Sequence, residues 1–264
     1  MSRIKNKFDH LSAKGEKALI AYIMAGDPNL SETEKIVLEI EKSGADFIEL
    51  GVPFSDPVAD GPTIQKAAER ALAQNVTLQA ILERVALIRK KTKIPILLMT
   101  YLNPIRAIGV ELFFKEARDA AVDGVIIPDL PLEEAKECLY WSRRYRIDLI
   151  FLVAPTTPFE RVKKIASVAT GFIYYVSLTG ITGATIKEIS SVTERISKIK
   201  SIVKIPVVAG FGIRTGEEAK AISRVADGII VGSLFVKTIE TAYEEGDFLP
   251  RLSRQAANLK AAIL

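Results

Sequence analysis

The sequence predicts an α/β fold: a closed (β/α)8 barrel in a single domain over residues 1–264, with an extra helix before the first strand. Short apolar runs alternate with longer segments of helical periodicity along the whole chain, as repeated β-then-α units require. Several short runs are continuous in Ile, Val and Leu, which is typical of parallel strands buried on both faces. No Gly/Ser-rich linker divides the 264 residues, a length that single α/β barrels commonly have.

Eight short apolar runs are the predicted strands. A doubly wound open sheet can be built from the same units and is the alternative architecture. The count of eight favours the closed barrel. The predicted strands are 18–24, 46–50, 95–100, 124–127, 148–153, 172–176, 206–209 and 228–231.

Segments with apolar residues at helical spacing separate these runs. Ser31 followed by Glu34 predicts a capping box, and Thr215 precedes Glu217 and Glu218 at a similar helix start. Residues 4–14 are predicted to form the extra helix, which could plug the floor of the barrel. The other predicted helices are 31–43, 63–73, 78–90, 110–120, 132–144, 158–167, 186–200 and 217–224, and 243–263 could hold two more.

The composition is that of a soluble globular protein, with 48% hydrophobic and 26% charged residues. No apolar run resembles a signal peptide or reaches the roughly 18 residues of a membrane span. Cys138 is the only cysteine, so no internal disulfide is possible and a cytoplasmic location is expected. The densest basic cluster, 89–93, falls at a predicted helix end, where cations favour the helix dipole. It predicts a solvated helix terminus rather than a nucleic-acid site.

The most informative segment is ELGVPFSDPVADGP, residues 49–62. Glu49 falls at the end of a predicted strand, and Asp60 closes the loop that follows. Three prolines and two glycines restrict this loop, while Asp56 is interpreted as a loop-shaping acid. Barrel chemistry takes place at the carboxyl ends of the strands, so the two carboxylates are predicted to act together in proton transfer.

Glycine-rich turns follow three successive predicted strands, at 180–184, 210–213 and 232–233. Glycines let backbone N–H groups approach an anion closely, and a helix beginning at Ser233 would add its positive end. Tight-turn packing is the alternative explanation. The three turns together favour a phosphate site, and therefore a small phosphorylated substrate. No nucleotide-binding loop is present in the sequence.

Missing residue types narrow the chemistry. The only histidine is His10, in the N-terminal extension, so a histidine and cysteine metal cluster cannot be built. A magnesium site made of carboxylates alone stays open. No predicted strand contains a lysine for a Schiff base, and Cys138 is interpreted as a packing or surface thiol. Acid–base chemistry by carboxylates remains, with Tyr101 and Tyr174 either lining the pocket or packing in the core.

At this point the chain resembles the tryptophan synthase alpha chain family. The resemblance covers essentially the whole chain, and its first motif is very specific. The motifs occur in the family's order: ELGVPFSDPVADGPTIQ (49–65), MTYLNP (99–104), PDLPLEE (128–134), APTTP (154–158), GITGA (180–184), AGFGI (209–213) and GSLFV (232–236).

The resemblance implies a reaction and a site. The substrate would be indole-3-glycerol phosphate, cleaved to indole and glyceraldehyde 3-phosphate without a metal or an imine. Glu49 would protonate the ring carbon and then help to deprotonate a glycerol hydroxyl, while Asp60 would hold the indole N–H. The remaining site residues implied are Gly183, Gly212, Gly232 and Ser233 for the phosphate, Tyr174 beside the glycerol, and Thr182 in a lid that meets Asp60.

The resemblance also implies a partner. Family members pair with a pyridoxal-phosphate-dependent beta chain, usually as an α2β2 heterotetramer, so no cofactor is expected in this chain. Loops around Asp56 and 103–104 would form part of the contact. Three alternatives stay open: another phosphate-binding barrel, a lyase that acts without a partner, and a catalytically silent regulatory subunit. The barrel that synthesises indole-3-glycerol phosphate would be expected to use a strand-end lysine, which is missing here.

Overall fold

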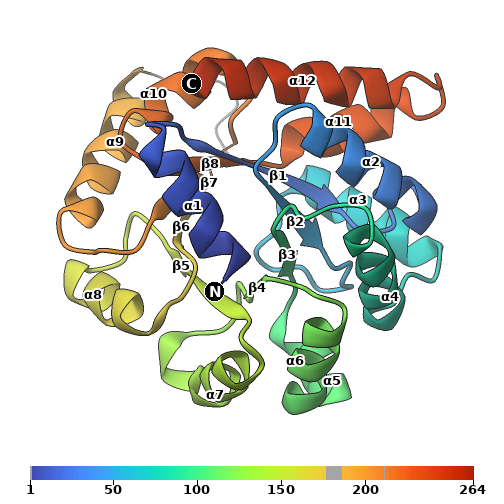
Figure 1. The fold of residues 1–264 in the computed structure, drawn as a ribbon, viewed down its shortest axis with the longest axis horizontal. Helices are drawn as coiled ribbons and strands as arrows, with labels where there is room; N and C mark the ends of the chain where they lie inside the picture. The colour runs from blue at the N-terminus through green and yellow to red at the C-terminus, as the bar shows by residue number, and fades with distance from the viewer. Residues whose placement is uncertain (1, 177–185, 211) are drawn as a thin grey trace.

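Eight parallel strands close into a barrel in chain order, β1 to β8, and β8 pairs with β1 (Figure 1). The computed structural model describes residues 2–176, 186–210 and 212–264. The predicted fold is confirmed, and every strand begins and ends within one residue of its prediction. The strands are Ala18–Met24, Phe47–Gly51, Ile96–Met99, Gly124–Ile126, Asp148–Val153, Ile173–Val176, Val207–Gly210 and Gly228–Val231.

Helices surround the barrel and cover its outer face (Figure 1). They bury apolar residues against the strands on one side and expose polar residues on the other, as the sequence pattern predicts. Their bounds are α1 Arg3–Ala13, α2 Leu30–Lys42, α3 Pro62–Ala73, α4 Leu78–Arg89, α5 Leu102–Ile108, α6 Val110–Asp119, η1 Leu132–Glu134, α7 Lys136–Tyr145, α8 Phe159–Val168, α9 Ile186–Lys200, α10 Gly216–Ser223, α11 Ser233–Ala242 and α12 Phe248–Ile263.

Three helix predictions were wrong in detail. The turn after β3 contains the short helix α5, and Pro104 is its third residue, where a missing N–H is tolerated. The predicted helix 132–144 is divided at Ala135 into a 3₁₀ turn and α7. The segment 243–263 holds only one helix, α12, because the other helix, α11, ends at Ala242.

One predicted cap is confirmed and the other is wrong. Thr215 accepts a hydrogen bond from the Glu218 N–H (3.2 Å), and Glu218 accepts one from the Thr215 N–H (3.3 Å), which completes a capping box. Helix α2 is capped instead by Asn29, whose side chain accepts from the Glu32 N–H at 2.9 Å. Ser31 only donates to the Asn29 side chain, so it lies inside the helix it was predicted to start.

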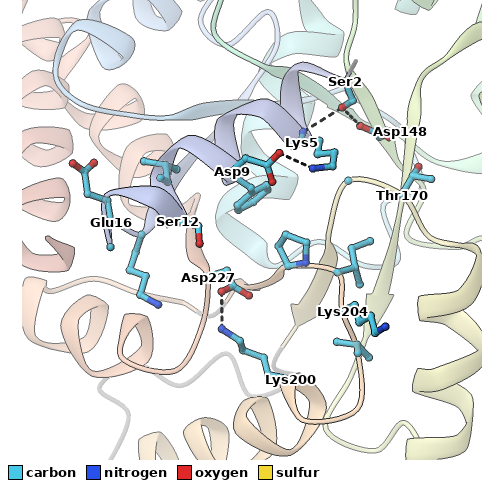
Figure 2. A pocket seen from close by; sticks show the side chains of 18 residues that line it. Ser2, Lys5, Asp9, Ser12, Glu16, Asp148, Thr170, Lys200, Lys204 and Asp227 are labelled. Atoms are coloured by element: carbon cyan, nitrogen blue, oxygen red, sulfur yellow. Dashed lines mark hydrogen bonds and ion pairs between the residues drawn. The ribbon is translucent and has the colours of Figure 1, made fainter.

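Helix α1 plugs the floor of the barrel, as predicted. Its Phe8 ring lies 4.8 Å from the Phe47 ring and 5.8 Å from the Phe172 ring, both at the amino ends of strands. Arg3 forms an ion pair of 2.8 Å with Asp123, and Ser2 donates a hydrogen bond to Asp148 (Figure 2). These contacts close the floor and leave the carboxyl ends of the strands as the open mouth.

A repeated device joins the strands at the floor. A polar side chain preceding each even-numbered strand accepts a hydrogen bond from an N–H near the start of the odd-numbered strand before it. Each bond satisfies a backbone N–H near the start of a strand. The four pairs are Asp46 with Leu19 (3.0 Å), Asp123 with Ile96 (2.9 Å), Thr170 with Leu149 (2.8 Å) and Asp227 with Val207 (2.9 Å).

The basic cluster 89–93 is only partly the solvated terminus that was predicted. Lys90, Lys91 and Lys93 are exposed. The Arg89 side chain is only 11% exposed and donates to the Asp123 carboxylate at 2.8 Å. Arg89 is therefore part of the floor. None of the helices in the part of the chain described here is long and apolar enough to cross a membrane.

Candidate active site

Glu49 lies inside the barrel, in the middle of β2 rather than at its end. In the sheet it is paired with Tyr22 of β1 on one side and Leu97 of β3 on the other. Its side chain is fully buried, and neither carboxyl oxygen has a hydrogen-bond partner among the described residues. A buried ionised carboxyl without a partner is costly, so this group resists giving up its proton.

Asp60 comes from the loop after β2, whose backbone is held by its own hydrogen bonds. The Asp60 N–H donates to the Pro57 carbonyl (3.1 Å), and the Gln65 side chain donates to the Asp60 carbonyl (2.8 Å). Asp56 accepts a hydrogen bond from the neighbouring Ser55 hydroxyl, in agreement with its interpretation as a loop-shaping acid. The loop therefore presents the Asp60 carboxylate from a restrained backbone.

Tyr101, after β3, fixes this loop over the site. The Ala59 N–H donates to the Tyr101 oxygen at 3.0 Å, and the Tyr101 hydroxyl interacts with the Asp60 carboxyl so as to lower its pKa. The Tyr101 ring is 3% exposed and lies 5.3 Å from the Phe54 ring of the same loop. Of the two roles left open for Tyr101, the structure shows the one at the site.

The two carboxyls differ in proton affinity. Burial raises the pKa of Asp60 to about 6, and the hydrogen bond from Tyr101 works against that rise. Burial, and then the negative charge of Asp60, raises the pKa of Glu49 to about 8. Asp60 ionises first, and its charge then holds the proton on Glu49. At neutral pH the site contains one acid and one base.

Two further phenols lie beside the carboxyls. Burial raises the pKa of Tyr174 well above its usual value, and the charges of Glu49 and Asp60 add to that rise. Tyr174 extends from β6 across Gly210, where a Cβ would come within 2.1 Å of its ring. The sequence did not single out Tyr22. Burial raises its pKa well above the usual value, and the charges of Asp60 and Glu49 add to that rise. Nothing in the apolar run of β1 distinguishes it from a packing residue.

The glycine-rich turns after β7 and β8 lie at adjacent strand ends. Helix α11 begins at Ser233, directly after Gly232, so its free N–H groups open onto the mouth as predicted. A Cβ at Gly212 would meet no described atom within 4 Å, so packing does not explain this glycine. Thr182 and Gly183 of the predicted site lie outside the described residues.

An ion-pair network supports the mouth beneath these turns. Arg70 of α3 donates two hydrogen bonds to Asp27, at 2.8 and 2.7 Å, and Asp27 is 1% exposed. Arg70 also contacts Glu240 of α11 at 3.1 Å. The loop after β1 is thereby tied to the helices on both sides of it, which favours a preorganised site.

The other candidate groups do not join this site. His10 is exposed on α1, and Cys138 is buried, with burial raising its pKa to about 11. A cavity of about 720 Å³ lies at the floor beside α1 (Figure 2). It is lined by four lysines and four carboxylates, so its charge favours neither an anion nor a cation. Within the described ranges, no group of three or more His, Cys, Asp or Glu side chains could hold a metal.

Comparisons with known proteins agree with this geometry. A family model described as the tryptophan synthase alpha chain matches residues 8–263. The chain is 48% identical to the tryptophan synthase alpha chain of Citrifermentans bemidjiense over 264 residues, which covers 100% of this chain and 98% of that one. A crystal structure of tryptophan synthase subunit alpha from Legionella pneumophila str. Paris has a TM-score of 0.94 at 39% identity, covering 100% of this chain and 98% of that one. A structure of tryptophan synthase from M. tuberculosis, in an aminoacrylate-bound form, has a TM-score of 0.88 at 36% identity and covers 100% of both chains.

Proposed function

Because this chain belongs to the tryptophan synthase alpha chain family, we propose that Glu49 and Asp60 perform the family's reaction as an acid–base pair. That reaction is the cleavage of indole-3-glycerol phosphate in tryptophan biosynthesis, so the chain is a carbon–carbon lyase. One observation supports this assignment above the others. Glu49 is fully buried, has no hydrogen-bond partner among the described residues, and keeps its proton at neutral pH beside an ionised Asp60.

Each carboxyl has a separate task in the cleavage. Glu49 gives its proton to the indole carbon that carries the glycerol chain, and the ring becomes cationic. The Asp60 carboxylate accepts the indole N–H and stabilises that positive charge. Glu49, now ionised, takes the proton of the glycerol hydroxyl next to the ring. The carbonyl forms as the carbon–carbon bond breaks, which yields indole and glyceraldehyde 3-phosphate and returns the proton to Glu49.

The phosphate is proposed to bind across the turns after β6, β7 and β8. Gly212, Gly232 and Ser233 supply backbone N–H groups and the start of α11, where an anion is favoured. Gly183 would complete this cradle, Tyr174 would lie beside the glycerol, and Thr182 would meet Asp60 when the lid closes. The depth of Glu49 below the mouth supports this arrangement, because the substrate would extend from the rim to the acid.

The test is the rate of indole release by Glu49→Gln in the presence of the partner subunit. Removing one general acid–base group is expected to lower kcat by about 10²–10⁴-fold. Such a loss corresponds to at least about 3 kcal/mol of barrier. Glu83→Gln is the matched control, since Glu83 is exposed on α4 and its replacement should leave the rate unchanged. A Glu49→Gln variant that keeps most of its turnover would overturn the assignment.

We propose further that the chain acts in the cytoplasm as one domain, bound to a pyridoxal-phosphate-dependent beta chain in an α2β2 complex. This chain itself is proposed to hold no cofactor. Val58 is 83% exposed beside Asp56 in the loop over the site, and Asn103 is exposed on α5 next to it. The Phe54 ring of this loop lies 5.3 Å from the Tyr101 ring directly before α5, so the two segments proposed for the contact lie side by side. Val58→Asp should weaken binding to the cognate beta chain in sedimentation experiments and leave the fold intact.

Indole release with and without the beta chain separates the proposed synthase subunit from an independent lyase and from a silent regulatory subunit. Slow release by the isolated chain and a large stimulation by the partner would support a synthase subunit. Equal and fast release under both conditions would make the chain an independent lyase. No release under either condition, with intact Glu49 and Asp60, would support a silent regulatory subunit instead.

A further inference from the structure

The Tyr22 side chain packs against two glycines near the mouth of the barrel. It is a β1 residue, 5% exposed, and it is paired in the sheet with Glu49. Its hydroxyl end lies against Gly51, where a Cβ would come within 2.2 Å of the hydroxyl oxygen. Its ring lies against Gly232, where a Cβ would come within 3.1 Å. Gly51 at the end of β2 and Gly232 directly after β8 therefore make the space that the phenol fills.

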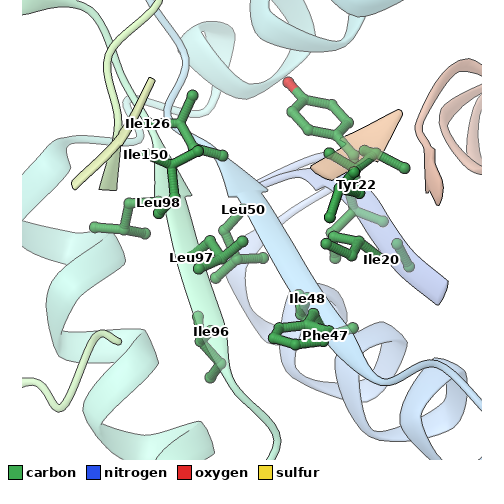
Figure 3. Packing of buried hydrophobic residues seen from close by; sticks show 14 of the residues in the cluster. Ile20, Tyr22, Phe47, Ile48, Leu50, Ile96, Leu97, Leu98, Ile126 and Ile150 are labelled. Carbon is green, nitrogen blue, oxygen red and sulfur yellow. The ribbon is translucent and has the colours of Figure 1, made fainter. Parts of the chain in front are cut away.

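The direction of the phenol follows from the strand geometry. Side chains two residues apart on a strand point to the same face, so the missing side chain of Gly51 lies directly above that of Glu49 toward the mouth. The phenol occupies this position. Figure 3 shows the Tyr22 ring at the end of the strands opposite to Phe47 and Ile96, which begin β2 and β3. Tyr22 thus lies between the Glu49 carboxyl and the open end of the barrel.

We propose that Tyr22 is a positioning residue of this active site: its ring, seated between Gly51 and Gly232, covers the Glu49 carboxyl and excludes water from it. The inference deepens the proposed function, because it names what keeps the proton on the acid of that reaction. Substrate would approach past this ring, and the carboxyl would meet the indole in a dry environment. The hydroxyl is not required for the effect, since covering the carboxyl depends on ring volume alone.

The other groups that face Glu49 are neutral or acidic. On the two strands that flank β2, the residues paired with Glu49 are the neutral Leu97 of β3 and Tyr22 of β1. Asp60, from the loop, and Tyr174, from β6, also face it, together with Tyr101 beyond Asp60. Burial is the larger cause of the raised pKa of Glu49, and the charge of Asp60 is the smaller. No described cation contributes to that shift. Removing the ring would act on the larger of these two causes.

The test is the titration of Glu49 in the ligand-free chain, measured by carbon-13 NMR with labelled glutamate. The Glu49→Gln variant identifies the signal. Tyr22→Ala is expected to move the titration at least about one pH unit toward acid, because water then reaches the carboxyl. Tyr22→Phe is expected to keep the titration of the parent protein. Gly51→Ala, whose new methyl would collide with the phenol, should move it in the same direction as Tyr22→Ala.

Activity gives a second readout that a purely structural residue would not affect in the same way. The alkaline limb of the kcat/KM profile should move to lower pH in Tyr22→Ala and stay in place in Tyr22→Phe. An unchanged Glu49 titration in Tyr22→Ala would overturn the proposal, and so would an equal shift in Tyr22→Phe. The NMR result does not depend on Glu49 being the catalytic acid, so its failure is distinct from a failure of the proposed function.

Discussion

The carboxyls at the floor of the barrel and Glu49 in its interior have opposite surroundings. At the floor, Asp123 accepts from Arg3, from Arg89 and from the Ile96 N–H, all within 2.9 Å. Asp46 accepts from Lys260 at 2.8 Å and from the Leu19 N–H at 3.0 Å. In the interior of the barrel, in the middle of β2, Glu49 has no partner among the described residues. The same barrel thus holds satisfied acids at its floor and an unsatisfied acid further inside.

This difference separates stability from chemistry. A carboxylate surrounded by N–H donors and cations is fixed in its charged form, so it stabilises the fold and cannot exchange a proton near neutral pH. An unpartnered carboxyl in a dry pocket destabilises the fold, and its proton is available for transfer. Paired carboxylates therefore stabilise the fold at the floor, as Asp27 with Arg70 does nearer the mouth, while Glu49 is left unpaired for chemistry. Three changes would test this contrast.

The largest expected effect is at the floor. Asp123→Ala leaves the largely buried Arg89 without its carboxylate and the Ile96 N–H without its acceptor. Breaking a buried pair on one side costs about 3–5 kcal/mol, to be measured by urea unfolding. Glu133→Ala is the matched control, because its pair with Arg161 is exposed and screened by water, so its loss should change the stability little. Comparable losses in both variants would contradict the contrast.

The next effect is a pH dependence of stability that originates at Glu49. The folded pKa of Glu49 is about 8, above its unfolded value of 4.5, so the folded state binds more protons between these values. Its contribution is complete below the unfolded pKa and is lost as pH rises through the folded pKa. Relative to Glu49→Gln, the parent protein should lose on the order of 3 kcal/mol between about pH 5 and about pH 8. Parallel stability curves for the two proteins would show that Glu49 is not held protonated.

The smallest effect concerns the link between Tyr101 and Asp60. Tyr101→Phe removes a hydrogen bond to the charged carboxylate, so the pKa of Asp60 should rise above its present value of about 6. The acid limb of the pH–rate profile should move upward, and kcat/KM should fall about tenfold, as expected for about 1–2 kcal/mol. Tyr140→Phe, at a residue 60% exposed on α7, should change neither. An acid limb that stays in place would mean that Asp60 does not control it.

Most of the fold could be predicted from the sequence because its signals are local. The strands are apolar runs of the right length, and the run 18–24 was predicted to the residue. Failures occurred where two local signals compete. Asn29 and Ser31 are both good capping residues, and the choice depends on where the chain leaves β1. The segment around Pro104 was predicted as a loop because proline is common in turns. Proline is also favoured in the first turn of a helix, and Pro104 lies there in α5.

The site could be predicted only in part, for the same reason. Glu49 and Asp60 lie in one unusual segment, so their partnership is visible in the sequence. Tyr22 becomes significant only through Gly51, at the end of β2, and Gly232, directly after β8, both far from it in the sequence. Tyr101 likewise acquires its role through contacts with a loop 41–42 residues earlier in the chain, and no local pattern signals such a contact.

The floor bonds between strand pairs have a consequence for how such a barrel can be assembled. Each of the four bonds joins an odd-numbered strand to the even-numbered strand that follows it, and none joins an even strand to the next odd one. These side-chain bonds therefore group the eight strands into four two-strand modules, while backbone hydrogen bonds, such as that from the Ile48 N–H to the Pro95 carbonyl (3.0 Å), continue from one module to the next. An exchange of sequence between related barrels would keep these four hydrogen bonds if the exchanged segments were joined after β2, β4, β6 or β8. A joint inside a module would sever one of them, so whole modules are the natural units for recombining this fold.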